Sequence, residues 1–313
     1  MTTAIVWLAL VAAPAAFGQP QRLVSTAPSI TELLYALGLG DRVAGVTRFC
    51  RYPPEAQKKP KIGDYVNPNL EAIAALRPDL VIIQTNPARL AVRLGALHLH
   101  VLEIDQGNIA ALYQSIRVVG NATGTSDAAE KLAASIHGRL DAIHQRVAAV
   151  RPVRMMFVVG RSPNRLDGLV VVGKASYLNE VIQIAGGENV FRDAVAAYPE
   201  VSLEEVIARN PEVIIDIGDM GDQNSSAAEH ARQVIAVWQR VRIVAAVRNN
   251  RVFPVTAEFY TIPGPRIVNA AQELVDMLHP EMQHQEKPHP ETQREETPHV
   301  EIPQPPTAHP ETP

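Results

Sequence analysis

Cysteine is almost missing from this 313-residue sequence, which contains only Cys50. A single thiol cannot form an internal disulfide, and it excludes sites built from several cysteines, such as structural zinc or iron–sulfur centres. An excess of basic charge is missing too, because 33 acidic residues outnumber 29 lysines and arginines. A protein without a basic field is not expected to bind nucleic acid or an anionic membrane surface.

Catalytic signatures are absent as well. The sequence contains no G-x-S-x-G, H-E-x-x-H or P-loop motif, and its glycine-rich runs at 38–45 and 185–190 lack phosphate-binding spacing. The few histidines before residue 279 have no accompanying carboxylates in a metal-ligand pattern. We therefore predict a protein that is not an enzyme, with no catalytic residue, no metal site and no cofactor of its own.

The sequence also lacks a hydrophobic run long enough to cross a membrane at its N-terminus. Residues 1–21 carry no charge, and the apolar run that begins at residue 5 ends at Pro14. About a dozen residues are too few for a helix across a bilayer about 30 Å thick. We interpret residues 1–18 as a cleaved export signal. Since no cysteine follows it for lipid attachment, we expect a soluble periplasmic protein.

What the sequence does contain is a regular alternation of short β-rich runs and stretches with helical periodicity. Examples are RLVS (22–25) before SITELLYAL (29–37), and EVIID (212–216) after LEEVIARN (203–210). This alternation is typical of a mostly parallel sheet flanked by helices. The fold class that we predict is therefore α/β, with two lobes that span 22–124 and 152–278.

A connector and a tail complete the predicted organisation. Residues 126–150 repeat apolar side chains every three or four positions, which predicts an amphipathic helix about 37 Å long at about 1.5 Å per residue. We assign 125–151 to this connector helix between the lobes. Residues 279–313 are rich in Pro, Glu, Gln, Thr and His and poor in large apolar residues, so we expect them to be disordered.

One segment of the chain occurs twice. NLEAIAALRPDLVII (69–83) and SLEEVIARNPEVIID (202–216) align with leucine, glutamate, alanine and proline at matching places. Asn69 and Ser202 are suited to cap the two predicted helices, which places Glu71 and Glu204 at the second helical position of each. A first-turn glutamate can simply complement the helix dipole. Two equivalent carboxylates, one on each lobe, would instead suit docking onto a partner with matched cations.

Several motifs together resemble a known family. They include TAPSITELLYALG (26–38), the duplicated segment, AGGENVF (185–191) and PRIVNAAQEL (265–274). Over 22–278 the chain is similar to substrate-binding proteins of cobalamin and iron–siderophore ABC importers, which have a helical backbone between two lobes. The resemblance implies that a small-molecule ligand lies in a cleft between the lobes. It also implies that Glu71 and Glu204 dock on an ABC permease, which works with ATPase subunits. We expect a monomer.

The resemblance also suggests which residues contact the ligand. Tyr65, Tyr198 and Gln84 match positions where the cobalamin-binding members carry tryptophan, and Glu258 matches an acidic residue that faces the corrin side chains. Aromatic residues in loops of both halves suit a flat amphipathic ligand, and Arg48, Arg161 and Arg266 could meet its carboxylates or amide oxygens. The predicted ligand-binding residues are Phe49, Tyr52, Tyr65, Gln84, Tyr198, Glu258, Phe259, Tyr260 and Arg266.

The sequence leaves the identity of the ligand open between several classes of compound. Cobalamin or a related corrinoid is the first expectation, and a ferric siderophore or haem is the alternative within the family. Bare metal would need histidine and carboxylate ligands from both lobes, which the sequence does not offer. An enzyme built on the same fold is the alternative from a different class.

Overall fold

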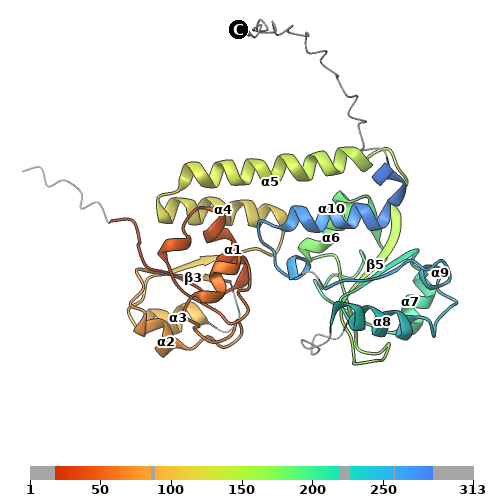
Figure 1. Cartoon of the computed structure of the whole chain (residues 1–313), viewed down its shortest axis with the longest axis horizontal. Coiled ribbons are helices and arrows are strands. Elements are labelled where there is room, and N and C mark those ends of the chain that lie inside the picture. The colour runs from red at the N-terminus through yellow and green to blue at the C-terminus, as the bar shows by residue number, and fades with distance from the viewer. Residues whose placement is uncertain (1–17, 86–88, 219–225, 257, 285–313) are drawn as a thin grey trace, which may run out of the picture.

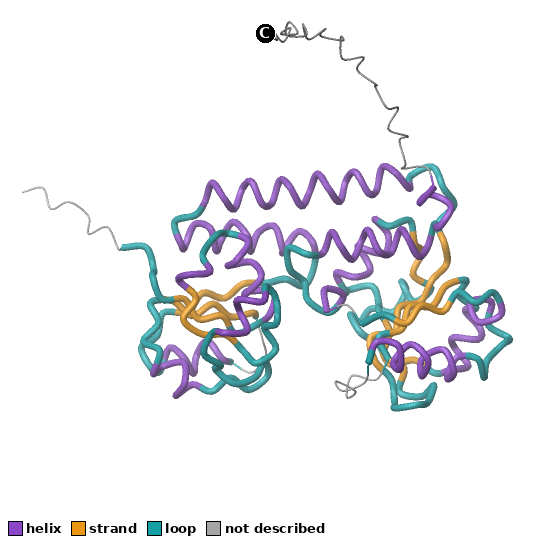
Figure 2. The backbone as a smooth tube through the Cα atoms, in the orientation of Figure 1, coloured by secondary structure: helices purple, strands orange, loops and turns teal. Residues whose placement is uncertain are grey.

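The computed structural model describes residues 18–85, 89–218, 226–256 and 258–284. Residues 1–17 of the predicted export signal and 285–313 of the predicted tail lie outside these ranges. Figure 2 shows two groups of strands, one in each lobe, with helices lying along both of them. The predicted two-lobed α/β fold is therefore confirmed.

The N-terminal lobe is built on a four-stranded sheet in the order β2-β1-β3-β4. Its neighbouring strands are all parallel, so their carboxyl ends share one edge of the sheet. The strands are β1 (Leu23–Ser25), β2 (Val43–Val46), β3 (Leu80–Gln84) and β4 (Val101–Ile104). The helices are α1 (Pro28–Ala36), η1 (Gly40–Arg42), η2 (Pro54–Lys58), α2 (Leu70–Ala75), α3 (Leu90–Gly95) and α4 (Ile109–Thr123).

The C-terminal lobe has a six-stranded sheet in the order β10-β9-β5-β6-β8, with β7 paired to β5. Strands β10, β9, β5 and β7 run parallel, whereas β6 and β8 are antiparallel to their neighbours. The strands are β5 (Val153–Gly160), β6 (Leu169–Val171), β7 (Gly187–Asn189), β8 (Glu200–Val201), β9 (Val213–Asp216) and β10 (Val252–Pro254). The helices are α6 (Tyr177–Ile184), α7 (Leu203–Arg209), α8 (Ala227–Trp238), α9 (Ala245–Arg248), η3 (Glu258–Tyr260) and α10 (Ile267–Leu278).

This second sheet is more mixed than the sequence suggested. A short connection leads from β5 into β6, and such a connection can join only antiparallel neighbours, since a parallel crossover needs a dozen or more residues. Within it, the Ser162 amide donates to the Asp167 carbonyl over 3.0 Å.

The connector helix α5 (Ser126–Val147) contains 22 residues and is therefore about 33 Å long. It lies along the top of both lobes in Figure 1, next to α4 and α10. One face of the helix is buried, as the predicted spacing of its apolar residues requires. The members of this face are Ala129, Ala133, Ile136, Leu140, Ile143 and Val147. The helix ends at Val147, earlier than the predicted boundary at 151, and Pro152 follows shortly after.

Each sheet is covered by helices on both faces. In β3, Ile82 packs into the core beneath α1, α4 and α5, while Val81 and Ile83 point to α2 and α3. In β5, Phe157 joins the same central core and Met156 faces the opposite core, which includes α7 and α8. The central core thus continues from one lobe to the other under α5, and α2 and α7 lie on the outer faces.

The structured chain continues past the predicted start of the tail. His279 is 2% exposed, and its Nε2 lies 3.2 Å from the Gly186 carbonyl oxygen. A short helix, η4 (Pro280–His284), follows, and Met282 packs against the central core. The prediction that residues 279–284 are disordered was therefore wrong. The imidazole and the methionine supply packing that the Pro- and Glu-rich composition did not suggest.

Candidate functional site

The two copies of the repeated segment fold alike. The Asn69 side chain accepts a hydrogen bond from the Ala72 amide at 3.0 Å, and Ser202 accepts one from Glu205 at 3.2 Å. Both predicted N-caps are confirmed. Each cap begins a short helix, α2 or α7, that leads into a central strand of its sheet, β3 or β9.

Glu71 and Glu204 are exposed at the second residue of α2 and α7. Neither carboxylate forms an ion pair with any residue that the structure describes. This differs from Glu205, the next residue in α7, whose carboxylate binds Arg209 at 2.9 Å. The two helices lie in the parts of the lobes away from α5 (Figure 1). Both carboxylates are thus available to a partner at the protein surface.

At the carboxyl edge of the N-terminal sheet, polar side chains form a connected network. The Tyr65 hydroxyl donates to Gln84 Oε1 at 2.6 Å, and partial burial raises the pKa of this phenol above its ordinary value. Gln84 Nε2 donates to Ser29 Oγ and to Gln106 Oε1, both at 2.8 Å. Gln106 Nε2 is buried and has no partner among the described residues. The network therefore contains one amide donor that lacks an acceptor.

Aromatic side chains from both lobes meet around one arginine. Arg266 precedes α10 in the C-terminal lobe, and its guanidinium lies 4.1 Å from the ring centre of Tyr52 in the N-terminal lobe. The ring of Phe259 lies 5.8 Å from the same guanidinium. Tyr52 is 46% exposed, so one face of this arrangement is open to solvent.

Two ion pairs cross between the lobes at the same place. Glu32 of α1 binds Arg266, with 3.0 Å between Arg266 Nε and Glu32 Oε2. Arg51 binds Glu258 at 3.1 Å between Arg51 Nη1 and Glu258 Oε1. We refer to Glu32, Arg51, Tyr52, Glu258, Phe259 and Arg266 as the lobe junction. Four of these six, Tyr52, Glu258, Phe259 and Arg266, were predicted as ligand contacts.

Other predicted contacts lie elsewhere or serve another purpose. Phe49 is half-buried beneath Arg48, whose guanidinium lies 5.0 Å from the ring centre. Tyr198 lies in the loop before β8 and is 44% exposed.

Tyr260 is a core residue. Its exposed fraction is 0%, and its hydroxyl donates to Glu273 Oε2 at 2.8 Å. Its carbonyl oxygen accepts a hydrogen bond from the Tyr177 hydroxyl at 2.6 Å, and its ring packs on Phe157 at 5.3 Å. Burial raises the pKa of the Tyr260 phenol far above its ordinary value. The structure thus corrects the prediction for Tyr260, because no surface of this side chain is left for a ligand.

The three arginines proposed to meet a ligand are already paired. Arg161 and Asp216 form a buried pair at 3.0 Å in the C-terminal lobe, with exposed side-chain fractions of 3% and 0%. Arg48 binds Asp64 at 3.2 Å, and Arg266 binds Glu32. A ligand carboxylate would have to compete with these protein carboxylates.

Three residues that were not predicted from the sequence lie beside the predicted ones: Glu32, Arg51 and Gln106. Glu32 had a usable signal, since it is a charged residue inside the apolar run SITELLYAL and a buried carboxylate needs a cationic partner. Arg51 and Gln106 stand in loops after strands, where the sequence gives no such contrast. Their positions follow from how the chain folds back at each sheet edge.

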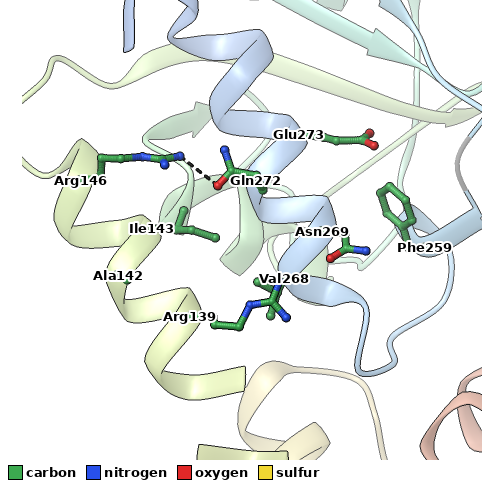
Figure 3. Close-up of a pocket in the computed structure, with 9 residues that line it drawn as sticks. All are labelled: Arg139, Ala142, Ile143, Arg146, Phe259, Val268, Asn269, Gln272 and Glu273. Carbon is green, nitrogen blue, oxygen red and sulfur yellow. Dashed lines mark hydrogen bonds between the residues drawn. The ribbon is translucent and has the colours of Figure 1, made fainter. Parts of the chain in front are cut away.

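A cavity of about 470 Å³ lies between α5 and α10 (Figure 3). Arg139, Ile143 and Arg146 line it from α5, and Val268, Gln272 and Glu273 line it from α10. Arg146 Nη2 donates to Gln272 Oε1 at 3.0 Å. Phe259 lines this cavity and also contacts Arg266, so the cavity and the lobe junction share that ring.

The described residues include no group of three or more His, Cys, Asp or Glu side chains that could hold a metal ion. Within the same ranges, no helix combines the length and apolar character that a membrane span requires. Cys50 is buried and forms hydrogen bonds with Thr31 and Thr47 at 3.1 Å. The junction offers aromatic rings and paired charges, and the separate network around Gln84 offers amide groups.

Comparison with known proteins agrees with this description. The family model described as periplasmic binding protein matches residues 23–258. An uncharacterised ABC transporter substrate-binding lipoprotein of Bacillus subtilis (strain 168) is 28% identical over 269 residues, which cover 84% of this chain and 81% of that protein. The relatives are transport proteins that bind substrates, not enzymes.

Two solved structures show the same fold with different ligands in their descriptions. The periplasmic vitamin B12 binding protein of Vibrio cholerae has a TM-score of 0.70 and 26% identity, covering 86% of this chain and 99% of that one. The periplasmic heme-binding protein of Roseiflexus sp. RS-1 also has a TM-score of 0.70 and 26% identity, covering 82% and 99%. The two structures have the same TM-score and the same identity to this chain, so the comparison does not indicate which of the two ligands this chain would bind.

Proposed function

Because the chain belongs to the periplasmic binding protein family, we propose that it is the substrate-binding component of an ABC importer. In this proposal residues 1–18 direct export and are removed, and the mature protein acts in the periplasm. It binds cobalamin or a related corrinoid where the two lobes meet and delivers it to a membrane permease. It works as a monomer, and the ATPase subunits of the importer hydrolyse ATP.

The observation that carries this proposal is the meeting of aromatic side chains from both lobes. Tyr52 and Phe259 come from parts of the chain more than 200 residues apart, yet they lie 4.1 and 5.8 Å from the same guanidinium. A flat ring system gains stacking contacts from such side chains, and the open face of Tyr52 leaves room for it. The site is shared between lobes, so a bound ligand would hold them together.

The amide network of the N-terminal lobe supports a ligand that carries carbonyl groups. A buried donor without a partner, such as Gln106 Nε2, costs about 1–3 kcal/mol. A ligand acceptor that reaches the network would remove this cost. The amide-bearing periphery of a corrinoid provides such acceptors, whereas a purely apolar ligand would not.

Glu71 and Glu204 are the groups that we propose to dock on the permease. The support for this docking role is that the two glutamates are equivalent. Both are exposed at the second residue of matching helices on the outer side of each lobe. Exposed carboxylates interact with cations over about 10 Å at moderate salt, so they would orient the encounter more than they would add affinity.

Calorimetric titration of the purified protein tests the ligand. We expect cyanocobalamin to bind at one site per chain and to be recovered unchanged after dissociation. Haem and a panel of ferric siderophores are titrated in parallel. If none of these compounds binds, the proposed function is wrong; if a compound is converted instead of released, the protein is an enzyme.

Haem is the second candidate, for a specific reason. Tyr52, Tyr65 and Tyr198 are exposed by 46%, 40% and 44%, and a tyrosine oxygen is one of the axial ligands that proteins offer to haem iron. Binding of haem with a tyrosinate absorption spectrum, together with failure to bind cyanocobalamin, would favour this candidate. The arginines near these rings would then face the haem propionates.

A further inference from the structure

The lobe junction contains four charges that alternate in sign across the two lobes. The N-terminal lobe contributes Glu32 and Arg51, and the C-terminal lobe contributes Glu258 and Arg266. Each ion pair therefore joins one lobe to the other. The two pairs differ in burial, since the side chains of Arg51 and Glu258 are 54% and 35% exposed, against 2% for Glu32.

Glu32 is placed to hold Arg266 with both of its oxygens. Arg266 Nε donates to Oε2 at 3.0 Å, and Arg266 Nη2 donates to Oε1. Two parallel bonds fix the plane of the guanidinium as well as its position, which one bond cannot do. The carboxylate lies in α1, a helix packed into the central core, so it offers a rigid base.

Close packing of the backbone supports the same contact. A Cβ atom on Gly264, two residues before Arg266, would lie 3.1 Å from Glu32 Oε2 and 3.6 Å from the Ser29 Cα. The loop that leads into α10 thus approaches the first turn of α1 closely, and glycine permits this approach. This backbone geometry brings Arg266 and Glu32 together, so the contact does not depend on long side chains that extend through solvent.

The fixed guanidinium in turn supports Tyr52. Its centre lies 4.1 Å from the centre of the tyrosine ring, within the range of a cation–π contact. A contact from the C-terminal lobe therefore holds an aromatic side chain of the N-terminal lobe. The chain of contacts runs from Glu32 through Arg266 to Tyr52, and it crosses the junction twice.

We propose that Glu32 is a positioning residue, which holds Arg266 as a brace between the lobes and so sets both the inter-lobe arrangement and the orientation of Tyr52. The use of Tyr52 as a ligand contact rests on the proposed function, but the brace does not. Arg51 and Glu258 form a more exposed pair at the same junction, and exposed pairs contribute little to stability. We therefore expect loss of Glu32 to loosen the inter-lobe arrangement more than loss of Arg51 or Glu258.

The chain contains a matched control for this brace. Asp64, Arg48 and Phe49 repeat the same chemistry, with an ion pair of 3.2 Å and a guanidinium 5.0 Å from an aromatic ring. All three belong to the N-terminal lobe. Asp64→Asn therefore removes an equivalent carboxylate charge without touching a contact between lobes.

Distances between spin labels on the two lobes test the proposal without any ligand. Val92→Cys and Ile243→Cys place labels on side chains that are 68% and 66% exposed, one in each lobe, while native Cys50 is 1% exposed and protected. Double electron–electron resonance then gives the distribution of inter-lobe distances. We expect Glu32→Gln to broaden this distribution about twofold and Asp64→Asn to leave it unchanged.

Arg266→Lys serves as the second variant. Lysine keeps the charge but lacks the planar fork, so we expect the same broadening. It also decides the result if Glu32→Gln does not fold. A wild-type distribution in a folded Glu32→Gln or Arg266→Lys protein would overturn the proposal, as would equal broadening by Asp64→Asn. Failure of every ligand titration would reject the proposed function and leave this result standing.

Discussion

Glu71 and Glu204 occupy the same position, the second residue, of two helices that belong to different lobes. Each helix starts at a side-chain cap, Asn69 or Ser202, and each leads into a central strand of its sheet. The equivalence extends to packing, since Ile73 of α2 and Val206 of α7 are both fully buried against their sheets. The repeated sequence thus places one exposed glutamate at the same helical position in each lobe.

Replacing both of these glutamates with alanine tests the docking role. We expect Glu71→Ala/Glu204→Ala to abolish uptake in a reconstituted importer while ligand affinity stays within about twofold of wild type, because neither carboxylate is one of the proposed ligand contacts. Uptake by the reconstituted importer and calorimetric titration measure the two effects. Glu229→Ala, at an exposed glutamate in the first turn of α8, is the control for lost helix-dipole stabilisation. Uptake that survives the double replacement would contradict the docking role.

The half-exposed tyrosines give a second prediction. If both tyrosines contact the ligand, Tyr65→Ala and Tyr198→Ala should each weaken binding by about tenfold, as expected when a buried aromatic contact is removed. Tyr65→Phe keeps the ring and removes only the hydroxyl that donates to Gln84, so a loss of only a few-fold is expected. Calorimetry measures the dissociation constants, and thermal unfolding checks the fold. A tyrosine whose alanine variant binds like wild type does not contact the ligand.

Glu32 should give the stability of the protein a characteristic pH dependence. Burial raises the pKa of this carboxyl above its ordinary value of 4.5, because desolvation outweighs the attraction of Arg266. The folded state then binds the proton more tightly than the unfolded state. The stabilisation from this group is complete below its unfolded pKa and is lost as the pH rises through the folded pKa.

Urea unfolding of wild type and Glu32→Gln at several pH values from about 4 to about 7 measures this effect. We expect the free energy of unfolding of wild type, relative to the variant, to decrease as the pH rises over this range. A relative stability that increases with pH would mean that pairing with Arg266 outweighs desolvation.

The connector helix provides a stability prediction with a larger magnitude. Leu140 is 3% exposed and packs in the core that both lobes share. Leu140→Ala removes buried methyl groups and leaves a cavity, so we expect the free energy of unfolding to decrease by about 2–5 kcal/mol. Arg139→Ala, at the adjacent exposed position, should change it by no more than about 0.5 kcal/mol. Urea unfolding compares the two, and equal effects would show that Leu140 is not a core residue of the connector.

Local patterns predicted several elements of this fold. The amphipathic spacing of 126–150 predicted α5, and the Asn69 and Ser202 caps predicted the starts of α2 and α7. These features depend on residues within one or two helical turns, so the sequence shows them directly. The direction of β6 and β8 was not predictable in this way, since it depends on how short connections return the chain to the sheet.

The candidate site was predictable only in part, for the same reason. Aromatic residues in loops after strands indicated a shared binding region, and Tyr52 and Phe259 do meet at the junction. Tyr260 follows Phe259 directly and looked equivalent, yet its side chain points into the core. Adjacent residues in a 3₁₀ turn point in different directions, and which of them meets solvent depends on what packs against the turn.

The sequence by itself determined that this protein has two α/β lobes, an amphipathic helix between them and a matched pair of glutamates at the second position of two helices, because these features depend on local spacing. Tertiary structure alone decided that Glu32 of one lobe holds Arg266 of the other across 234 residues of chain. No local pattern predicts such a contact. A charged residue in an apolar run indicates that a partner of opposite charge is needed, but it does not indicate which residue provides that partner.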